Sequence, residues 1–330
     1  MTRPRPFRFG VFGEDARTPT VLLETARRAE DAGYSTFLIR DHFIDEPFGH
    51  QLAPLTALTA VATTTTRLRV GSLVFSNDYR HPAVLAKEIA TLDALSNGRV
   101  ELGLGAGFSK AEYDRAGLAF DPPGVRVDRL EESIHVLKGL FGERPFTFTG
   151  KHYSVTDLEG YPKPVQRPHP PLLIGAAGTR MLSIAAREAD IIGFQTVSTS
   201  RGAVTNDPSG RVAAAVAQRV EHVRRIAAER FERIELSLVA TVVLADQRRP
   251  VAERLARQHG WSGLSSEQVL EMPSVFIGSL DHVADEMRAR RERYGFSYYV
   301  ILDRAMTATA PLVARLAGTR EHAIRSFVTR

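Results

Sequence analysis

The chain has 330 residues, of which 43% are hydrophobic and 25% charged, a composition typical of a globular protein with a sizeable core. It contains no cysteine, which excludes disulfides, thiolate metal sites and cysteine nucleophiles. No apolar run approaches the ~20 residues that span a bilayer, and the polar start MTRPRP lacks the core of a signal peptide. We therefore expect a cytoplasmic protein without a membrane partner.

The formal net charge is +5, which can indicate a nucleic-acid partner. The basic residues are scattered along predicted helices, often beside Glu or Asp, and no basic run with interleaved aromatic residues occurs. We therefore expect no nucleic-acid partner. The basic balance is compatible with an anionic cofactor or substrate.

Short apolar runs alternate with helical patterns along the chain. After the first run, Thr18 and Pro19 begin a helix that ends at Gly33, because Thr is a favourable cap, Pro fits the first turn and Gly ends helices. Buried strands are expected at 7–12, 35–40, 68–75, 100–104, 172–174, 190–194, 234–244 and 296–302. Later helical patterns cover 55–62, 82–96, 125–141, 179–187, 211–228, 250–258, 266–271, 281–294 and 310–316. Residues 108–124 are expected to be irregular.

Two stretches interrupt this alternation. Residues 142–171 are rich in Pro and Gly with short β-like pieces, and residues 195–210 form a polar loop without periodicity, a length typical of functional or mobile loops. Eight strands alternating with helices and no internal linker predict one α/β domain over 1–330, a closed (β/α)8 TIM barrel with these stretches as loop insertions at its C-terminal face. A doubly wound open sheet is the alternative.

Polar residues follow the second predicted strand. Asp41 and His42 stand directly after it, and His50 lies in the same loop. Residues just past the C-terminal end of a barrel strand line the active-site mouth, so the pair is a candidate active site. The competing interpretation is an Asp that caps the next turn beside a solvated His.

A glycine-rich turn follows the fifth predicted strand and leads into a helix, running from Gly175 through Gly178 to Thr179 and Arg180. Free N–H groups at a helix N-terminus and an arginine nearby favour a phosphate group, whereas an ordinary tight turn needs the same glycines. Another cluster, Gly103 to Gly107, follows the fourth strand without the acidic residue of a dinucleotide fold. No hydrolase or metal motif occurs, so no metal is expected.

Five segments carry a resemblance to a known family. They are RDH at 40–42, GSLVFSNDYRHP at 71–82, LDALSNGRVELGLGAG at 92–107, LLIGAAGTRMLSIAAREAD at 172–190 and IGSLDHVADEM at 277–287. In this order and spacing the chain resembles the luciferase-like monooxygenase superfamily over nearly its whole length, and within it the branch that uses the deazaflavin coenzyme F420. The resemblance implies a (β/α)8 barrel, usually a homodimer, with F420 or alternatively FMN at the C-terminal ends of the strands.

The resemblance also implies roles for particular residues. His42, with Asp41 to orient it, would lie beside the reactive edge of the ring and exchange a proton. Ser72–Leu73 would be a non-proline cis peptide behind the ring, where an ordinary trans strand is the alternative. The ring and ribityl chain would contact Asn77, Gly105, Ala106 and Gly107, and the phosphate would bind Gly175, Ala176, Ala177, Gly178, Thr179 and Arg180.

The resemblance implies an F420-dependent oxidoreductase that transfers hydride between deazaflavin C5 and a small organic molecule, by reduction of an activated C=C or C=N or by oxidation of an alcohol. Phe108 stands where sugar-phosphate dehydrogenases of the superfamily have an acid, which argues against glucose-6-phosphate and for an apolar or planar substrate. Tyr79 and His50 are also expected on the substrate side. The alternatives are an FMN-dependent monooxygenase with a separate reductase and a non-catalytic flavin-binding homologue.

Overall fold

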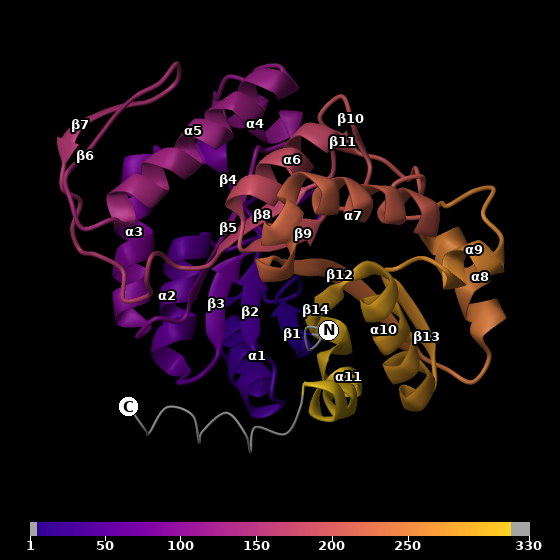
Figure 1. Cartoon of the computed structure of the whole chain (residues 1–330). Coiled ribbons are helices and arrows are strands. Elements are labelled where there is room, and N and C mark those ends of the chain that lie inside the picture. Colours follow the sequence, from indigo (N-terminus) through magenta and orange to yellow (C-terminus); the bar gives the residue numbers. More distant parts are fainter. Residues whose placement is uncertain (1–4, 318–330) are drawn as a thin grey trace.

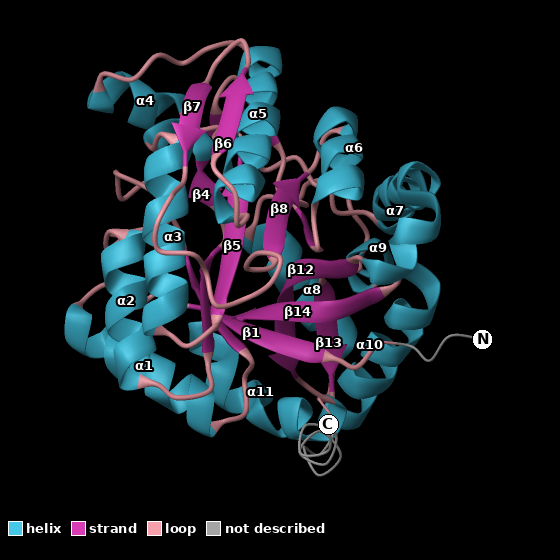
Figure 2. Ribbon diagram, turned by 60° about the vertical axis from the view of Figure 1, so that its left-hand side comes forward, coloured by secondary structure: helices cyan, strands magenta, loops and turns pink. Residues whose placement is uncertain are grey.

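The computed structural model describes residues 5–317, in which parallel strands close into a barrel (Figures 1 and 2). In ring order the strands are β1 (Arg8–Phe12), β2 (Thr36–Ile39), β3 (Arg69–Ser72), β5 (Val100–Gly105), β8 (Leu172–Ala176), β9 (Ile191–Phe194), β12 (Glu235–Leu244) and β14 (Phe296–Leu302). β12 pairs with both β9 and β14, and β14 pairs with β1, so the ring has no free edge. The prediction of a (β/α)8 barrel is confirmed, and the open sheet is wrong.

Helices surround the barrel (Figure 2). They are α1 (Pro19–Asp31), α2 (Pro54–Thr64), α3 (Pro82–Leu95), α5 (Pro123–Phe141), α6 (Thr179–Glu188), α7 (Ala213–Ala227), α8 (Arg248–Gln258), α9 (Ser266–Leu270), α10 (Leu280–Tyr294) and α11 (Asp303–Leu316). The Thr18 side chain accepts a hydrogen bond from the Val21 N–H, so the predicted cap of α1 is present. No helix among the described residues has the length and apolarity to cross a membrane.

The inserted segments contain small hairpins outside the barrel. β6 (Phe146–Thr149) and β7 (Ser154–Leu158) pair within 142–171, and the hairpin lies beside α5 (Figure 2). Two-residue strands, β10 (Thr199–Ser200) and β11 (Ala203–Val204), pair within the loop 195–210.

The third barrel strand is shorter than predicted. β3 ends at Ser72, which stays in register with Ile39, and the Leu73 N–H still donates to the Ile39 carbonyl at 2.9 Å. The cis peptide joins Leu73 and Val74, so the predicted position, Ser72–Leu73, is wrong by one residue. The Leu73 N–H still takes part in the pairing with β2, so the backbone leaves the strand one residue later than predicted. β4 (Phe75–Ser76) then resumes pairing with β5, followed by the short helix η1 (Asn77–Tyr79).

Three elements differ from the expected pattern. The four-residue strand β13 (Val275–Gly278) pairs with the far half of β12, outside the ring. α11 begins well before the predicted residue 310 and contains Pro311 in its interior. The short helix α4 (Lys110–Ala116) occupies the segment 108–124 that is expected to be irregular, and it ends at Gly117 in the left-handed conformation.

A charged cluster fills the barrel near the N-terminal ends of its strands. Glu101 of β5 is 1% exposed, and its carboxylate binds the guanidinium groups of Arg8 on β1 and Arg69 on β3, the latter at 2.8 Å. Arg8 also binds Glu235 of β12 at 2.7 Å, and the Tyr298 hydroxyl of β14 donates to Glu101 at 3.3 Å. Five barrel strands are thereby tied together by one network of charges.

Candidate active site

His42 follows β2 and is held by a carboxylate from another part of the chain. Its Nδ1 lies 2.9 Å from Oε2 of Glu112, a residue of α4 that is 1% exposed. The other oxygen of Glu112 accepts the N–H groups of Phe43 at 2.6 Å and Ile44 at 3.3 Å. Glu112 therefore fixes both the imidazole and the backbone that follows it.

The environment of Glu112 keeps its carboxylate ionised. Burial opposes ionisation, but hydrogen bonds from His42, from the Phe43 N–H and from Tyr79 outweigh it and lower the pKa of Glu112. The Tyr79 hydroxyl donates to Oε2 at 2.9 Å, and burial together with the Glu112 charge raises the pKa of Tyr79. Tyr79 is expected on the substrate side, but its hydroxyl hydrogen is donated to Glu112.

Asp41 has a different set of partners from the one expected. It is buried, accepts the Ser76 N–H at 3.0 Å and forms a bidentate pair with Arg80 at 2.6 and 3.1 Å. It ties the end of β2 to the corner after β4. The carboxylate that orients His42 is therefore Glu112, and the expectation that Asp41 does so is wrong.

Aromatic side chains surround the His42 ring. Phe48 lies 4.9 Å and Phe108 5.8 Å from its centroid, and the two phenyl rings are 6.4 Å apart. The Arg40 guanidinium stacks over Phe48 at 3.9 Å. His50 is exposed, and the residue of this loop whose ring packs against His42 is Phe48. The space beside the imidazole is walled by apolar rings.

Glycines at the end of β5 and in β8 lie against the side chain of Val74. A Cβ at Gly105 would lie 2.7 Å from a Val74 methyl, and one at Gly175 would lie 3.4 Å away. Gly107 has φ +70°, and a Cβ there would lie 2.1 Å from the Tyr113 hydroxyl. A side chain at Gly105 or Gly107 would displace Val74 or Tyr113, whereas one at Gly175 would only make ordinary van der Waals contact with Val74.

Asn77 lies in the same part of the barrel mouth. It is 2% exposed and its Nδ2 donates to the Tyr153 hydroxyl at 3.3 Å, whereas its Oδ1 has no hydrogen-bond partner among the described residues. Arg126 of α5 donates to the carbonyl groups of Ala106, at 3.4 Å, and Gly107. The unpaired, buried Oδ1 is an acceptor available to a bound molecule.

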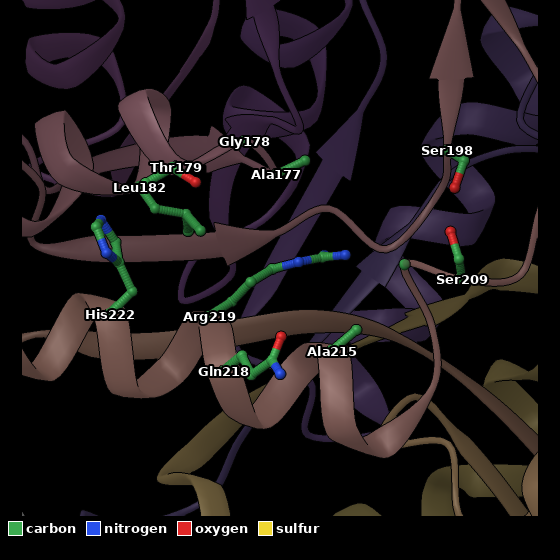
Figure 3. Close-up of a pocket in the computed structure, with 11 residues that line it drawn as sticks. Ala177, Gly178, Thr179, Leu182, Ser198, Ser209, Ala215, Gln218, Arg219 and His222 are labelled. Carbon is green, nitrogen blue, oxygen red and sulfur yellow. The ribbon is translucent and has the colours of Figure 1, made fainter.

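A pocket of about 470 Å³ opens between the turn after β8 and helix α7. Ala177, Gly178 and Thr179 line it from the turn, and Arg219 and His222 line it from α7. Figure 3 shows Arg219 extending from α7 between Ala177 and Ala215. The first turn of α6 supplies N–H groups and a positive dipole end beside an arginine, an arrangement suited to an anion.

The arginine that lines this pocket is Arg219, whereas Arg180, which is predicted to bind a phosphate, lies outside its lining. Arg180 binds Asp128 and the Gly124 carbonyl of the α5 region, and it does not line the pocket. Gly175 and Ala176 lie within β8 itself. Arg219 contacts the Gln195 carbonyl at 3.0 Å and has no carboxylate partner among the described residues, and burial lowers its pKa.

Two residues of the site, Glu112 and Arg219, are absent from the site predicted from sequence. A sequence signal existed for Glu112: the pattern Ser109-x-x-Glu112 before Gly117 is typical of a short capped helix. For Arg219, one of many arginines on predicted helices, no such signal exists. Among residues 5–317, no group of three or more His, Asp or Glu residues is arranged to bind a metal ion.

About half of the chain is similar to F420-dependent dehydrogenases. An F420-dependent glucose-6-phosphate dehydrogenase of Amycolatopsis mediterranei is 35% identical over 175 residues, 52% of each chain. One of Nakamurella multipartita is 35% identical over 201 residues, 59% of this chain and 57% of that one. The chain therefore spans about half the length of these dehydrogenases. An uncharacterized protein of Mycobacterium tuberculosis is 31% identical over 287 residues, 81% of this chain and 90% of that one.

Solved structures share the fold at low sequence identity. An F420-dependent secondary alcohol dehydrogenase, in complex with an F420-acetone adduct, has a TM-score of 0.74 and 17% identity, covering 94% of this chain and 98% of that one. A long-chain alkane monooxygenase has a TM-score of 0.72 and 15% identity, covering 96% and 91%. The family model for luciferase-like monooxygenases matches residues 6–325. The chain belongs to the luciferase-like monooxygenase family.

Proposed function

We propose that the protein is an F420-dependent oxidoreductase that exchanges a hydride and a proton with a small organic molecule. The observation that carries the proposal is the His42–Glu112 pair at the C-terminal end of β2, in a barrel whose β8–α6 turn forms an anion-suited pocket. The names of the dehydrogenase relatives and of the alcohol dehydrogenase structure support F420 as the cofactor.

The residues present fit such a cofactor. The phosphate would lie at the first turn of α6, against Thr179 and Arg219, where N–H donors and an arginine without a carboxylate partner converge. The Asn77 Oδ1 atom would accept a hydrogen bond from a hydroxyl or N–H of the ring or its ribityl chain. When bound, the deazaflavin supplies the hydride chemistry.

The chain's own residues supply the proton and the surroundings. His42 is the titratable side chain at the mouth that Glu112 orients, and imidazole exchanges protons readily near neutral pH. Phe48 and Phe108 exclude water from the imidazole and favour an apolar or planar substrate, such as a secondary alcohol, its ketone or an activated alkene. Neither ring provides a partner for a sugar hydroxyl, so we propose that glucose-6-phosphate is a poor substrate.

Arg219→Ala is expected to weaken F420 binding by about 10-fold to 100-fold, because it removes a charge-assisted hydrogen bond to the phosphate. Titration of the purified variants with F420, followed by fluorescence, measures the effect. The matched control is Arg180→Ala, whose guanidinium is already bound to Asp128, and we expect a change of less than about 3-fold. Equal losses in both variants would place the phosphate nearer α5 than we propose.

The second candidate function is that of an FMN-dependent monooxygenase, because a long-chain alkane monooxygenase shares the fold. Side-by-side titration with F420 and FMN separates the two functions, because the proposed enzyme binds F420 more tightly. Tighter FMN binding, together with substrate oxidation by reduced FMN and oxygen, would favour the monooxygenase instead.

A further inference from the structure

We infer that Glu112 is a positioning residue for His42: it holds a hydrogen on Nδ1, so that Nε2 is the atom that exchanges a proton with the substrate. The part of this inference that concerns the substrate rests on the proposed function. The part that concerns the imidazole does not, because it follows from contacts within the chain.

The hydrogen-bond partners of Glu112 settle which atoms donate. Oε1 receives two backbone N–H groups, from Phe43 and Ile44, which can only donate. Oε2 receives the Tyr79 hydroxyl and faces Nδ1 of His42. An ionised carboxylate has no hydrogen to offer, so Nδ1 must carry one, whether the ring is neutral or charged. The neutral ring is therefore the Nδ1–H tautomer.

The other ring nitrogen is left for the substrate. Within residues 5–317, Nε2 of His42 has no hydrogen-bond partner, and the nearest rings, Phe48 and Phe108, carry neither donor nor acceptor. In a reduction, the substrate atom next to the carbon that gains hydride takes the proton from Nε2, and the ring becomes neutral with its hydrogen on Nδ1. In the oxidation of an alcohol, neutral Nε2 takes the hydroxyl proton.

Glu112→Gln tests this geometry with little change in shape. The amide oxygen can still accept the two backbone N–H groups, but an NH₂ group now replaces Oε2. That group can only donate, so Nδ1 must accept and the ring hydrogen moves to Nε2. Tyr79→Phe is the matched control, because it removes one hydrogen bond to the same oxygen and leaves the charge and the Nδ1 contact in place.

The experiment is ¹⁵N NMR of the full-length protein labelled at histidine, without cofactor, at a pH where the ring is neutral. The His42 signals are those missing from a His42→Asn variant. We expect the Nδ1–H pattern in the wild-type protein and in Tyr79→Phe, and the Nε2–H pattern in Glu112→Gln. An Nε2–H pattern in the wild-type protein, or an unchanged pattern in Glu112→Gln, overturns the inference.

Kinetics give the second readout. Glu112→Gln should lower kcat by about 10²–10⁴-fold, as expected when a catalytic imidazole has the wrong tautomer, with F420 affinity within about 3-fold of wild type. Unchanged turnover in this variant also overturns the inference. Failure of wild-type protein to bind F420 would instead refute the proposed function, and the NMR patterns would still decide the role of Glu112.

Discussion

Replacing His42 by alanine is expected to lower kcat by about 10²–10⁴-fold, the usual contribution of a general acid or base. The loss follows because, among residues 5–317, the other titratable side chain bound to Glu112 Oε2 is Tyr79, and the raised pKa of Tyr79 keeps its hydroxyl protonated. Turnover is measured by the absorbance of F420, with the best substrate from a panel of secondary alcohols, ketones and activated alkenes. Affinity for F420 should stay within about 3-fold, because the phosphate lies at α6 in the proposed complex.

The control for this variant is His135→Ala, which removes an exposed imidazole on α5. Its turnover should equal that of the wild-type protein. If His42→Ala kept wild-type kcat while binding F420, a non-catalytic role of His42 would follow, and the flavin-binding homologue would become the better explanation.

Glu101→Gln is expected to cost about 3–5 kcal/mol of unfolding free energy at pH 7, because it leaves Arg8 and Arg69 without their shared buried anion. Urea denaturation followed by circular dichroism measures the difference. The control is Glu143→Gln, whose pair with Arg167 is exposed and should contribute less than about 1 kcal/mol. Equal stabilities of the wild-type and Glu101→Gln proteins would show that the network adds no net stability.

The pH dependence of this difference has a defined sign. Burial opposes ionisation of Glu101, but the charges of Arg8 and Arg69 outweigh it and lower the pKa of Glu101 below that of an unfolded chain. Stability from such a group is complete above the unfolded value, about 4.3, and disappears as pH falls through the lower folded value. The gap between wild type and Glu101→Gln should therefore shrink below about pH 4.

The barrel was predictable from sequence because most of its strands lie in apolar runs bounded by turn residues. The misplaced elements have local causes. β13 pairs with the far half of β12, outside the ring, and the alternation of strands and helices along the sequence does not indicate such a strand. α4 is seven residues long, too short for a full hydrophobic repeat, and its Glu112 points inward to His42. Because α4 is short and lies between Gly107 and Gly117, the sequence of this segment shows no helical periodicity.

The site was predictable only in part. The position of His42 follows from its place after a strand, but its partner lies 70 residues away, and no motif joins the two. Asp41 is adjacent in sequence, yet Arg80 and the Ser76 N–H take its carboxylate. Adjacency in sequence therefore does not show which carboxylate binds the imidazole, because the fold decides which groups come within hydrogen-bond distance. The homodimer stays a prediction that sedimentation can test.

The phenyl rings beside His42 can be substituted independently of the hydrogen bond that holds its imidazole. Phe48 and Phe108 pack against the imidazole through their rings, whereas the hydrogen bond that the imidazole makes within residues 5–317 goes to Glu112. Smaller or larger residues at 48 and 108 can therefore remodel the range of accepted molecules without loosening the proton-transfer group. Libraries randomised at these two positions should yield altered selectivity far more often than inactive protein.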